Sequence, residues 1–378
     1  MGTRVLDEAV LDVRRKGMKG KIDRLFSLDV LRGLDMLLLV VIGPLILKAN
    51  AAWHCFSAGF IGQFRHGWEC FTLWDIIMPL FIFMCGAAVP FALKRRMDGG
   101  LASYWRHVLV RVTLLWFLGM LVQGGLADLN PLTFDPFSNT LQAIAVGYLV
   151  TAAVMCVPSR TFGIGVTVLL ALLYSLCLAL GGDYTEFGNF AFKVDHWVHV
   201  LIFPSGHTRL LYPYFYTWYL TSLMFAVMTL CGYHATCLLQ AAWPKRDKAM
   251  ALFAYSAALL IVGFFASLWI PVIKPIFTLS FTSLAMGWSV LALAILYVIN
   301  DVFMIRRGFG VVLLFGQCAL AAYFVSAFFR PVLESFSQTI ACGVLPHFSE
   351  GVRPFVLQVV VSASLVVFLV AWRRQRRK

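Results

Sequence analysis

The stretch FTLWDIIMPLFIFMCGAAVPFAL, residues 71–93, indicates the class of fold. It runs for 23 residues with one charged side chain, Asp75, and without alternation between polar and apolar positions. A continuous apolar segment of about 20 residues is long enough to cross the hydrocarbon core of a bilayer as an α-helix. A strand of a membrane barrel would instead alternate over about ten residues. The stretch therefore predicts a transmembrane helix.

Similar apolar stretches recur along the whole chain. Apolar residues make up 61% of the 378 positions and charged residues only 13%, whereas about a quarter of a soluble domain is charged. This composition excludes a soluble enzyme, a disordered chain and a disulfide-stabilised miniature domain. We expect an all-α, polytopic transmembrane helix bundle with about ten spans, the length allowing roughly ten to twelve. The expected spans are residues 29–48, 71–93, 107–124, 139–157, 161–181, 214–239, 249–270, 277–300, 308–328 and 352–372, with shorter elements at 190–204 and 331–345.

The basic residues predict the orientation of the chain. Twenty-two Lys and Arg residues fall in the tails and the loops on the side of both termini, and seven fall on the opposite side. Cytoplasmic loops of membrane proteins carry such an excess, so we expect both termini in the cytosol. The same rule accounts for the net charge of +13 without a nucleic-acid partner.

The domain organisation is simple. No repeat, linker or low-complexity segment divides the chain. Residues 1–24 are basic and lack the apolar core of a secretory signal, so we expect a cytosolic tail there. One transmembrane domain is expected over residues 25–372, followed by a second basic cytosolic tail over residues 373–378. The nine cysteines form no Cys-x-x-Cys pair, and no metal site is predicted.

Charged side chains within the first span are the first candidates for function, because each costs about 2.5–3.5 kcal/mol at the centre of a bilayer on insertion scales. Asp29, Arg32 and Asp35 follow one another at spacings of three and so share one side of a helix. Two interpretations stay open. The three form an ion-pair network that holds the first span in the bundle, or they form a polar wall that meets a charged ligand at the cytosolic mouth.

A histidine and an acid at the mouth of the second span suggest proton transfer. Asp75 lies about one turn inside the outer interface, and His66, Trp68 and Glu69 come just before it. A carboxylate within reach of a histidine fixes its tautomer and stabilises its cation. The spacing predicts a catalytic pair of His66 and Asp75, with a surface histidine as the alternative.

Four further residues are candidates for binding a substrate, each with a structural alternative. The amides of Gln142 and Gln317 lie in or near spans, where amides commonly hold helices together. Lys274 lies in a short outer loop, from which its ammonium could extend to water. Trp218 stands where an interfacial tryptophan anchors a helix.

Seven segments in this order resemble the membrane acyltransferases related to heparan-α-glucosaminide N-acetyltransferase, and in particular their compact bacterial members, which carry a domain of unknown function. The segments are SLDVLRGLDM (27–36), HGW (66–68), residues 71–93, LQAIAVGYL (141–149), YTWYLTSLMF (216–225), KPIFTLSFTSLAMGWSVLALAILYVINDV (274–302) and LFGQCALAAY (314–323).

The resemblance implies an enzyme of the bacterial inner membrane that transfers acetyl from cytosolic acetyl-CoA to the amino group of a glucosamine. His66 would be the general base or the acetyl carrier, Asp75 its acid, and a homodimer is a possible assembly. The chain departs from the family pattern at Cys318, where relatives carry Asn. The phosphates of the donor are expected to meet cytosolic arginines, since Arg and Lys usually make such contacts; the candidates are Arg24, Arg32, Arg95 and Arg96. The remaining candidates, for the substrate, are Asp29, Asp35, Trp68, Gln142, Trp218, Lys274 and Gln317.

A protein of another class is the main alternative. A transporter or flippase for a small polar or sugar-linked molecule would also have about ten spans, intramembrane Asp and Arg, and helices interrupted by proline. Against it, no inverted repeat is visible, and the polar residues gather in the first two spans.

Overall fold

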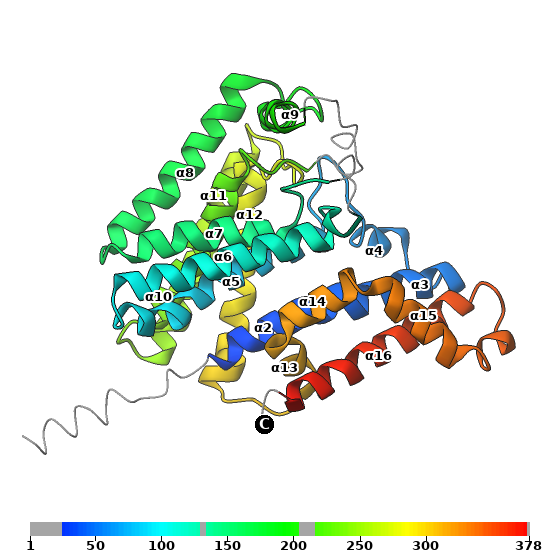
Figure 1. The fold of residues 1–378 in the computed structure, drawn as a ribbon. Helices are drawn as coiled ribbons and strands as arrows, with labels where there is room; N and C mark the ends of the chain where they lie inside the picture. The colour runs from blue at the N-terminus through cyan, green and yellow to red at the C-terminus, as the bar shows by residue number, and fades with distance from the viewer. Residues whose placement is uncertain (1–24, 129–133, 204–215, 376–378) are drawn as a thin grey trace, which may run out of the picture.

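The computed structural model describes residues 25–128, 134–203 and 216–375. Within these ranges every regular element is helical, and the one pairing of extended backbone is an isolated bridge between Glu69 and Ile273. Figure 1 shows the helices stacked around one another with no sheet between them. The all-α fold expected from the sequence is confirmed.

Eight helices in the described ranges are long and apolar enough to cross a membrane, which makes this a multi-pass membrane protein. The first runs from Phe26 to Trp53 and comprises α2 (Phe26–Leu37), the π-helical η1 (Leu38–Ile42) and α3 (Gly43–Trp53). The others are α5 (Leu73–Met97), α6 (Leu101–Val122), α8 (Arg160–Gly181), α10 (Ser222–Leu239), α11 (Lys245–Ser267), α12 (Leu279–Tyr297) with the π-helical η4 (Val298–Val302), and α16 (Arg353–Gln375).

Two further expected spans appear as helices of unusual form. Helix α7 (Thr140–Met155) is apolar but has only 16 residues. The segment expected at 308–328 consists of α13 (Gly310–Gln317) and α14 (Ala319–Ala327), which meet at Cys318 with a bend of 77°. Each of the ten expected spans therefore has a helical counterpart, although the hydropathy of 308–328 gave no sign of the bend.

Short helices complete the described chain. The elements expected at 190–204 and 331–345 are α9 (Phe190–Ile202) and the amphipathic α15 (Arg330–Ala341). Three single-turn elements lie in loops: α4 (Ala58–Gly62), η2 (Leu126–Asp128) and η5 (Leu345–His347).

The π-helical turn in the first span has a cause in the sequence. Pro44 lies two residues after η1, at the beginning of α3. A proline inside a helix has no N–H to donate, and its ring collides with the carbonyl four residues earlier, here that of Val40. A wider π turn accommodates this collision without ending the helix.

The helices divide into an inner and an outer group. More than half of the apolar span is buried in α5, α10 and the span of α12, at 56%, 67% and 56% respectively. The corresponding share is 17–22% in α6, α8 and α11, which expose apolar side chains such as Leu109, Leu172 and Ile261 respectively. Apolar side chains that the protein does not cover suit the hydrocarbon of a bilayer, so α5, α10 and α12 form the protected centre.

Small residues allow the inner helices α5 and α10 to approach closely. A Cβ atom added to Gly232 of α10 would overlap the carbonyl oxygen of Phe83 in α5, and one added to Gly86 of α5 would overlap the carbonyl of Thr229 in α10. The hydroxyl of Thr236 donates to the carbonyl of Ala87 at 2.7 Å. Close backbone contact and a side-chain hydrogen bond are the usual means by which membrane helices associate.

We expect Gly232→Ala to destabilise the protein, because backbone atoms of α5 would have to move to admit one methyl group. Overpacking of this kind costs about 1–3 kcal/mol. Thermal melting in detergent measures the effect, with Gly165→Ala as the matched control, because a Cβ at Gly165 in α8 meets no atom within 4 Å. Equal melting temperatures for the two variants would contradict the close contact.

Candidate functional site

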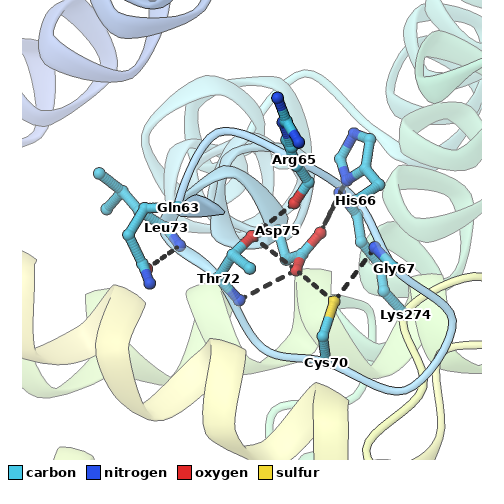
Figure 2. A network of polar contacts seen from close by, with 9 residues as sticks. All are labelled: Gln63, Arg65, His66, Gly67, Cys70, Thr72, Leu73, Asp75 and Lys274. Atoms are coloured by element: carbon cyan, nitrogen blue, oxygen red, sulfur yellow. Dashed lines mark hydrogen bonds and ion pairs between the residues drawn. The ribbon is translucent and has the colours of Figure 1, made fainter. Parts of the chain in front are cut away.

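The beginning of α5 holds the acid of the predicted pair in a fixed position. The Oδ2 atom of Asp75 accepts hydrogen bonds from the backbone N–H of Thr72 at 3.0 Å and from its hydroxyl at 2.8 Å. Asp75 is the third residue of the helix, where an acidic side chain caps the preceding turn and meets the positive end of the helix dipole. Gln63 accepts from the N–H groups of Leu73 (Figure 2) and Trp74, so the loop before α5 is tied to the same helix end.

Three predicted residues meet at the other carboxylate oxygen of Asp75. Its Oδ1 atom lies 2.8 Å from Nδ1 of His66 and 3.2 Å from Nζ of Lys274, and the two nitrogens are 3.4 Å apart (Figure 2). The side chain of Asp75 is fully buried and that of Lys274 is 5% exposed, whereas that of His66 is 26% exposed. A buried acid therefore holds one buried cation and one imidazole that reaches the surface.

The loop of residues 271–278 brings Lys274 to this point. Its residue Ile273 forms the bridge with Glu69, which lies in the loop of His66. Thr278 closes the loop, because its hydroxyl accepts from the N–H of Ile273 at 3.1 Å and donates to the carbonyl of Pro271 at 2.9 Å. Burial lowers the pKa of the Lys274 ammonium, and the neighbouring Asp75 carboxylate opposes that shift.

A third segment, residues 216–219, packs against the other two. The ring of Tyr216 lies 5.9 Å from Nζ of Lys274, and the N–H of Thr217 donates to the carbonyl of Pro275 at 3.1 Å. The N–H groups of Trp218 and Tyr219 donate to the carboxylate of Asp195 in α9, at 2.6 and 3.1 Å. These bonds hold the segment out of a helix, which explains why α10 begins at Ser222 rather than near the expected residue 214.

The arrangement has the parts of a base and its orienting group. In the tautomer with its proton on Nδ1, His66 donates to Asp75, and the lone pair on Nε2 is then the basic position. A carboxylate that holds the imidazole in this tautomer also stabilises the imidazolium that forms when Nε2 takes a proton. The geometry suits general-base catalysis or attack by the imidazole itself.

Trp68 and Trp218 lie in the loops that form this site. The indole N–H of Trp68 donates to the carbonyl of Tyr184 at 3.0 Å, which ties the His66 loop to the segment before α9. Trp218 packs against Phe137 and Phe225, with ring centroids 5.6 and 5.9 Å apart.

The acidic and basic residues of the first span do not form one ladder. Arg32 pairs with Asp29, with 3.4 Å between Nη1 and Oδ1. Asp35 is 2% exposed, and neither of its oxygens has a hydrogen-bond partner in the described residues. The pair and the lone carboxyl are therefore separate features.

The two predicted amides also lie apart from His66. Gln142 is buried, and its Oε1 accepts from the N–H groups of Ser138 and Asn139 while its Nε2 donates to the carbonyl of Pro136. Its observed contacts thus shape the beginning of α7. Gln317 is exposed beside Cys318, at the bend between α13 and α14.

The described arginines predicted to meet phosphates lie in two different helices. Arg96 is exposed in its last turn, and Arg32 lies in α2. Arg24 and the side chain of Arg95 lie outside the described residues. No group of three or more His, Cys, Asp or Glu residues in the described ranges could hold a metal ion.

The sequence did not single out Asp195, Tyr216 or Cys70. Asp195 is a lone acid in the amphipathic α9, and only the folded chain places it beside residues 218–219. Burial raises the pKa of its carboxyl to about 7, against the opposing effect of the two N–H donors. Cys70 lies between His66 and Asp75 in sequence, and its thiol is 3.6 Å from Oδ2 of Asp75.

Comparison with known proteins gives one family match. A family model described as a domain of unknown function (DUF5009) matches residues 24–125. The matched segment covers α2 to α6 and includes His66 and Asp75, but it is less than half of the 378 residues. A search of curated proteins found no match to the chain.

We expect the thiol of Cys70 to react more slowly with maleimide than the exposed Cys55. Burial raises the pKa of the Cys70 thiol, and the Asp75 carboxylate adds to that shift, so less of the reactive thiolate forms near neutral pH. Peptide mapping by mass spectrometry after brief labelling at pH 7–8.5 measures both rates. Asp75→Asn should accelerate labelling of Cys70 and leave Cys55 unchanged; faster labelling of Cys70 than of Cys55 in the unmodified sequence would refute the arrangement.

The buried Asp195 should make stability depend on pH. Its folded pKa of about 7 exceeds the value of about 3.9 in an unfolded chain, so the folded state binds the proton more tightly. The resulting stabilisation is complete below pH 4 and is lost as the pH rises through 7. We expect the melting temperature to fall between pH 5 and 8, and this component to be absent in Asp195→Asn. The prediction is contradicted if the melting temperature of the unmodified protein stays constant or rises with pH. It is also contradicted if the melting temperatures of the unmodified protein and Asp195→Asn change equally with pH.

Proposed function

We propose that this protein is a membrane-embedded acyltransferase that moves acetyl from cytosolic acetyl-CoA to the amino group of glucosamine or a related amino sugar. The observation that carries the proposal is the partly exposed imidazole of His66 held by the buried Asp75 at the mouth of a span. The resemblance of seven sequence segments to N-acetyltransferases supplies the reaction, and the site supplies groups able to perform it. Two cytosolic termini, a place in the bacterial inner membrane and a homodimer are parts of the same proposal.

The proposed chemistry follows from the roles of the three side chains. The amine of the sugar must lose a proton as its nitrogen attacks the acetyl carbon, and Nε2 of His66 accepts that proton. The new C–N bond forms, the C–S bond breaks, and the thiolate of CoA leaves and takes up a proton. Asp75 stabilises the imidazolium, while the Lys274 ammonium balances the charge of the buried carboxylate.

A covalent route uses the same residues. Nε2 of His66 attacks the acetyl carbon, CoA leaves, and the sugar amine then takes the acetyl group from the imidazole. The two routes differ in whether acetylated protein accumulates when the acceptor is withheld. A rapid chase with radiolabelled acetyl-CoA should show labelled protein in the covalent route and none in the direct one.

Acetyl transfer by the purified protein is the decisive test. With labelled acetyl-CoA and a panel of amino and hydroxyl sugars, we expect transfer to an amino sugar that His66→Ala abolishes. Asp75→Asn should lower kcat by about 10²–10⁴-fold, the usual contribution of a positioned acid–base pair.

The matched control for this test is His54→Asn, a change of the neighbouring outer-loop histidine. His54 is exposed, and its left-handed backbone, with φ of 50°, is one that asparagine tolerates. It should retain full activity. If His66→Ala still transfers acetyl, the proposed role of the histidine is overturned. If the unmodified protein binds no acetyl-CoA and transfers acetyl to no acceptor, the proposed function is overturned.

Transport is the second candidate, and one observation favours it. Asp35 is a carboxyl buried in the first span with no hydrogen-bond partner in the described residues, three residues before the π-helical η1. Intramembrane acids of this kind often carry protons in transporters. Proteoliposomes that contain the protein would then take up a labelled sugar. Transport would be favoured over acyl transfer if Asp35→Asn abolishes this uptake and His66→Ala leaves it intact.

A further inference from the structure

Arg111 lies in the middle of a membrane-spanning helix. It is the eleventh of the 22 residues of α6, so neither end of the helix brings its guanidinium to water. An arginine at the centre of a span costs about 2.5–3.5 kcal/mol on insertion scales and much more in simulations. Such a residue is retained where a counter-charge or a ligand meets it.

The contact that the structure gives for the Arg111 guanidinium is aromatic rather than acidic. Its guanidinium lies 4.6 Å from the ring centre of Tyr148 in α7, on the inner side of α6. In the part of the chain that the structure describes, no carboxylate forms an ion pair with it. The thiol of Cys85 in α5 lies within electrostatic range of both Arg111 and Arg32, which places two guanidinium groups around one point of the bundle.

The first span carries two acidic residues, Asp29 and the buried Asp35, and in the described residues neither forms an ion pair with Arg111. Asp29 pairs with Arg32 at 3.4 Å and so offsets one positive charge. Thr151 is fully buried one turn beyond Tyr148, and its hydroxyl has no hydrogen-bond partner in the described residues. The described side chains thus leave the guanidinium of Arg111 without a carboxylate at ion-pair distance, and a guanidinium in that position suits an anion.

We propose that Arg111, together with Arg32, binds a phosphate or pyrophosphate ester of the acyl donor inside the helix bundle. This inference rests on the proposed function and identifies where the charged part of the donor is held. Guanidinium groups match phosphate oxygens in geometry and form charge-assisted hydrogen bonds with them. Binding of the anion would supply the counter-charge that Arg111 lacks among the described residues.

The position of this site relative to His66 fits a long donor. Cys85 follows Asp75 by ten residues on the same helix, which at 1.5 Å per residue separates the two levels by about 15 Å. A donor with its phosphates at the level of Cys85 could extend a flexible pantetheine arm along α5 and present its thioester near His66. The helix thus sets the length that the arm must cover.

Equilibrium binding of labelled CoA to the full-length protein in detergent tests the inference. We expect Arg111→Gln to weaken CoA binding at least tenfold and Arg111→Lys to weaken it less, since lysine keeps the charge. Arg106→Gln removes an exposed arginine of the same helix and should change affinity less than twofold. Pantetheine, which has no phosphate, should compete for CoA in the parent and bind equally well to Arg111→Gln.

Each contrary result has a distinct meaning. Unchanged CoA affinity in Arg111→Gln overturns the inference and leaves the proposed function standing. If Arg111→Gln loses CoA binding and pantetheine binding equally, Arg111 has a structural role and the inference is overturned. The same conclusion follows if Arg111→Gln and Arg111→Lys both lower the melting temperature and weaken CoA binding equally. If the unmodified protein binds no CoA, the proposed function fails, and binding of inorganic pyrophosphate then tests the anion site by itself. Pyrophosphate binding that depends on Arg111 supports the anion site. The absence of pyrophosphate binding overturns it.

Discussion

The negative charge of Asp75 constrains more of this molecule than any other single group. Its side chain is fully buried at the N-terminal end of the inner helix α5, and an unpaired carboxylate there would be very unfavourable. The ammonium that balances it comes from Lys274, 208 residues after the histidine that shares the same oxygen. The loops before α5 and before α12 must therefore converge, and the bridge between Glu69 and Ile273 is how their backbones meet.

The sequence predicted those parts of the site that are local. His66 and Asp75 lie nine residues apart, one in a loop and one in the helix turn that follows it, so their contact requires only a short reversal of the chain. Lys274 was predicted to bind substrate or to extend to water, and its contact with Asp75 depends on how α5 and α12 pack. Asp195 was missed for the same reason, because nothing near α9 in the sequence reveals that residues 218–219 need an acceptor.

Hydropathy predicted the helices for a similar reason, since every span is a continuous segment that must satisfy its own backbone in lipid. It could not predict how individual helices deviate. The π turn before Pro44 follows from a local residue, but the late start of α10 arises where the loop before α12 and Asp195 bond to residues 217–219, and the bend at Cys318 has no sign in the hydropathy. The amide of Gln142 shows the same limit: its contacts with the backbone before α7 depend on a turn that periodicity does not report.

Helix α5 sets the distance between the His66 site and the level of Cys85. The helix carries Asp75 in its first turn, Cys85 at its middle and Arg96 in its last turn, and it remains one continuous helix despite Pro79 and Pro90. Under the proposed function, an acyl group must react at the first level while the charged part of its carrier is held at the second, about 15 Å away. A small acyl phosphate cannot be in both places, whereas a thioester on a long flexible arm can. Under the proposal, the spacing between these two levels of α5 sets the length of the donor, and His66 at the first level and the arginines beside Cys85 at the second set its chemistry.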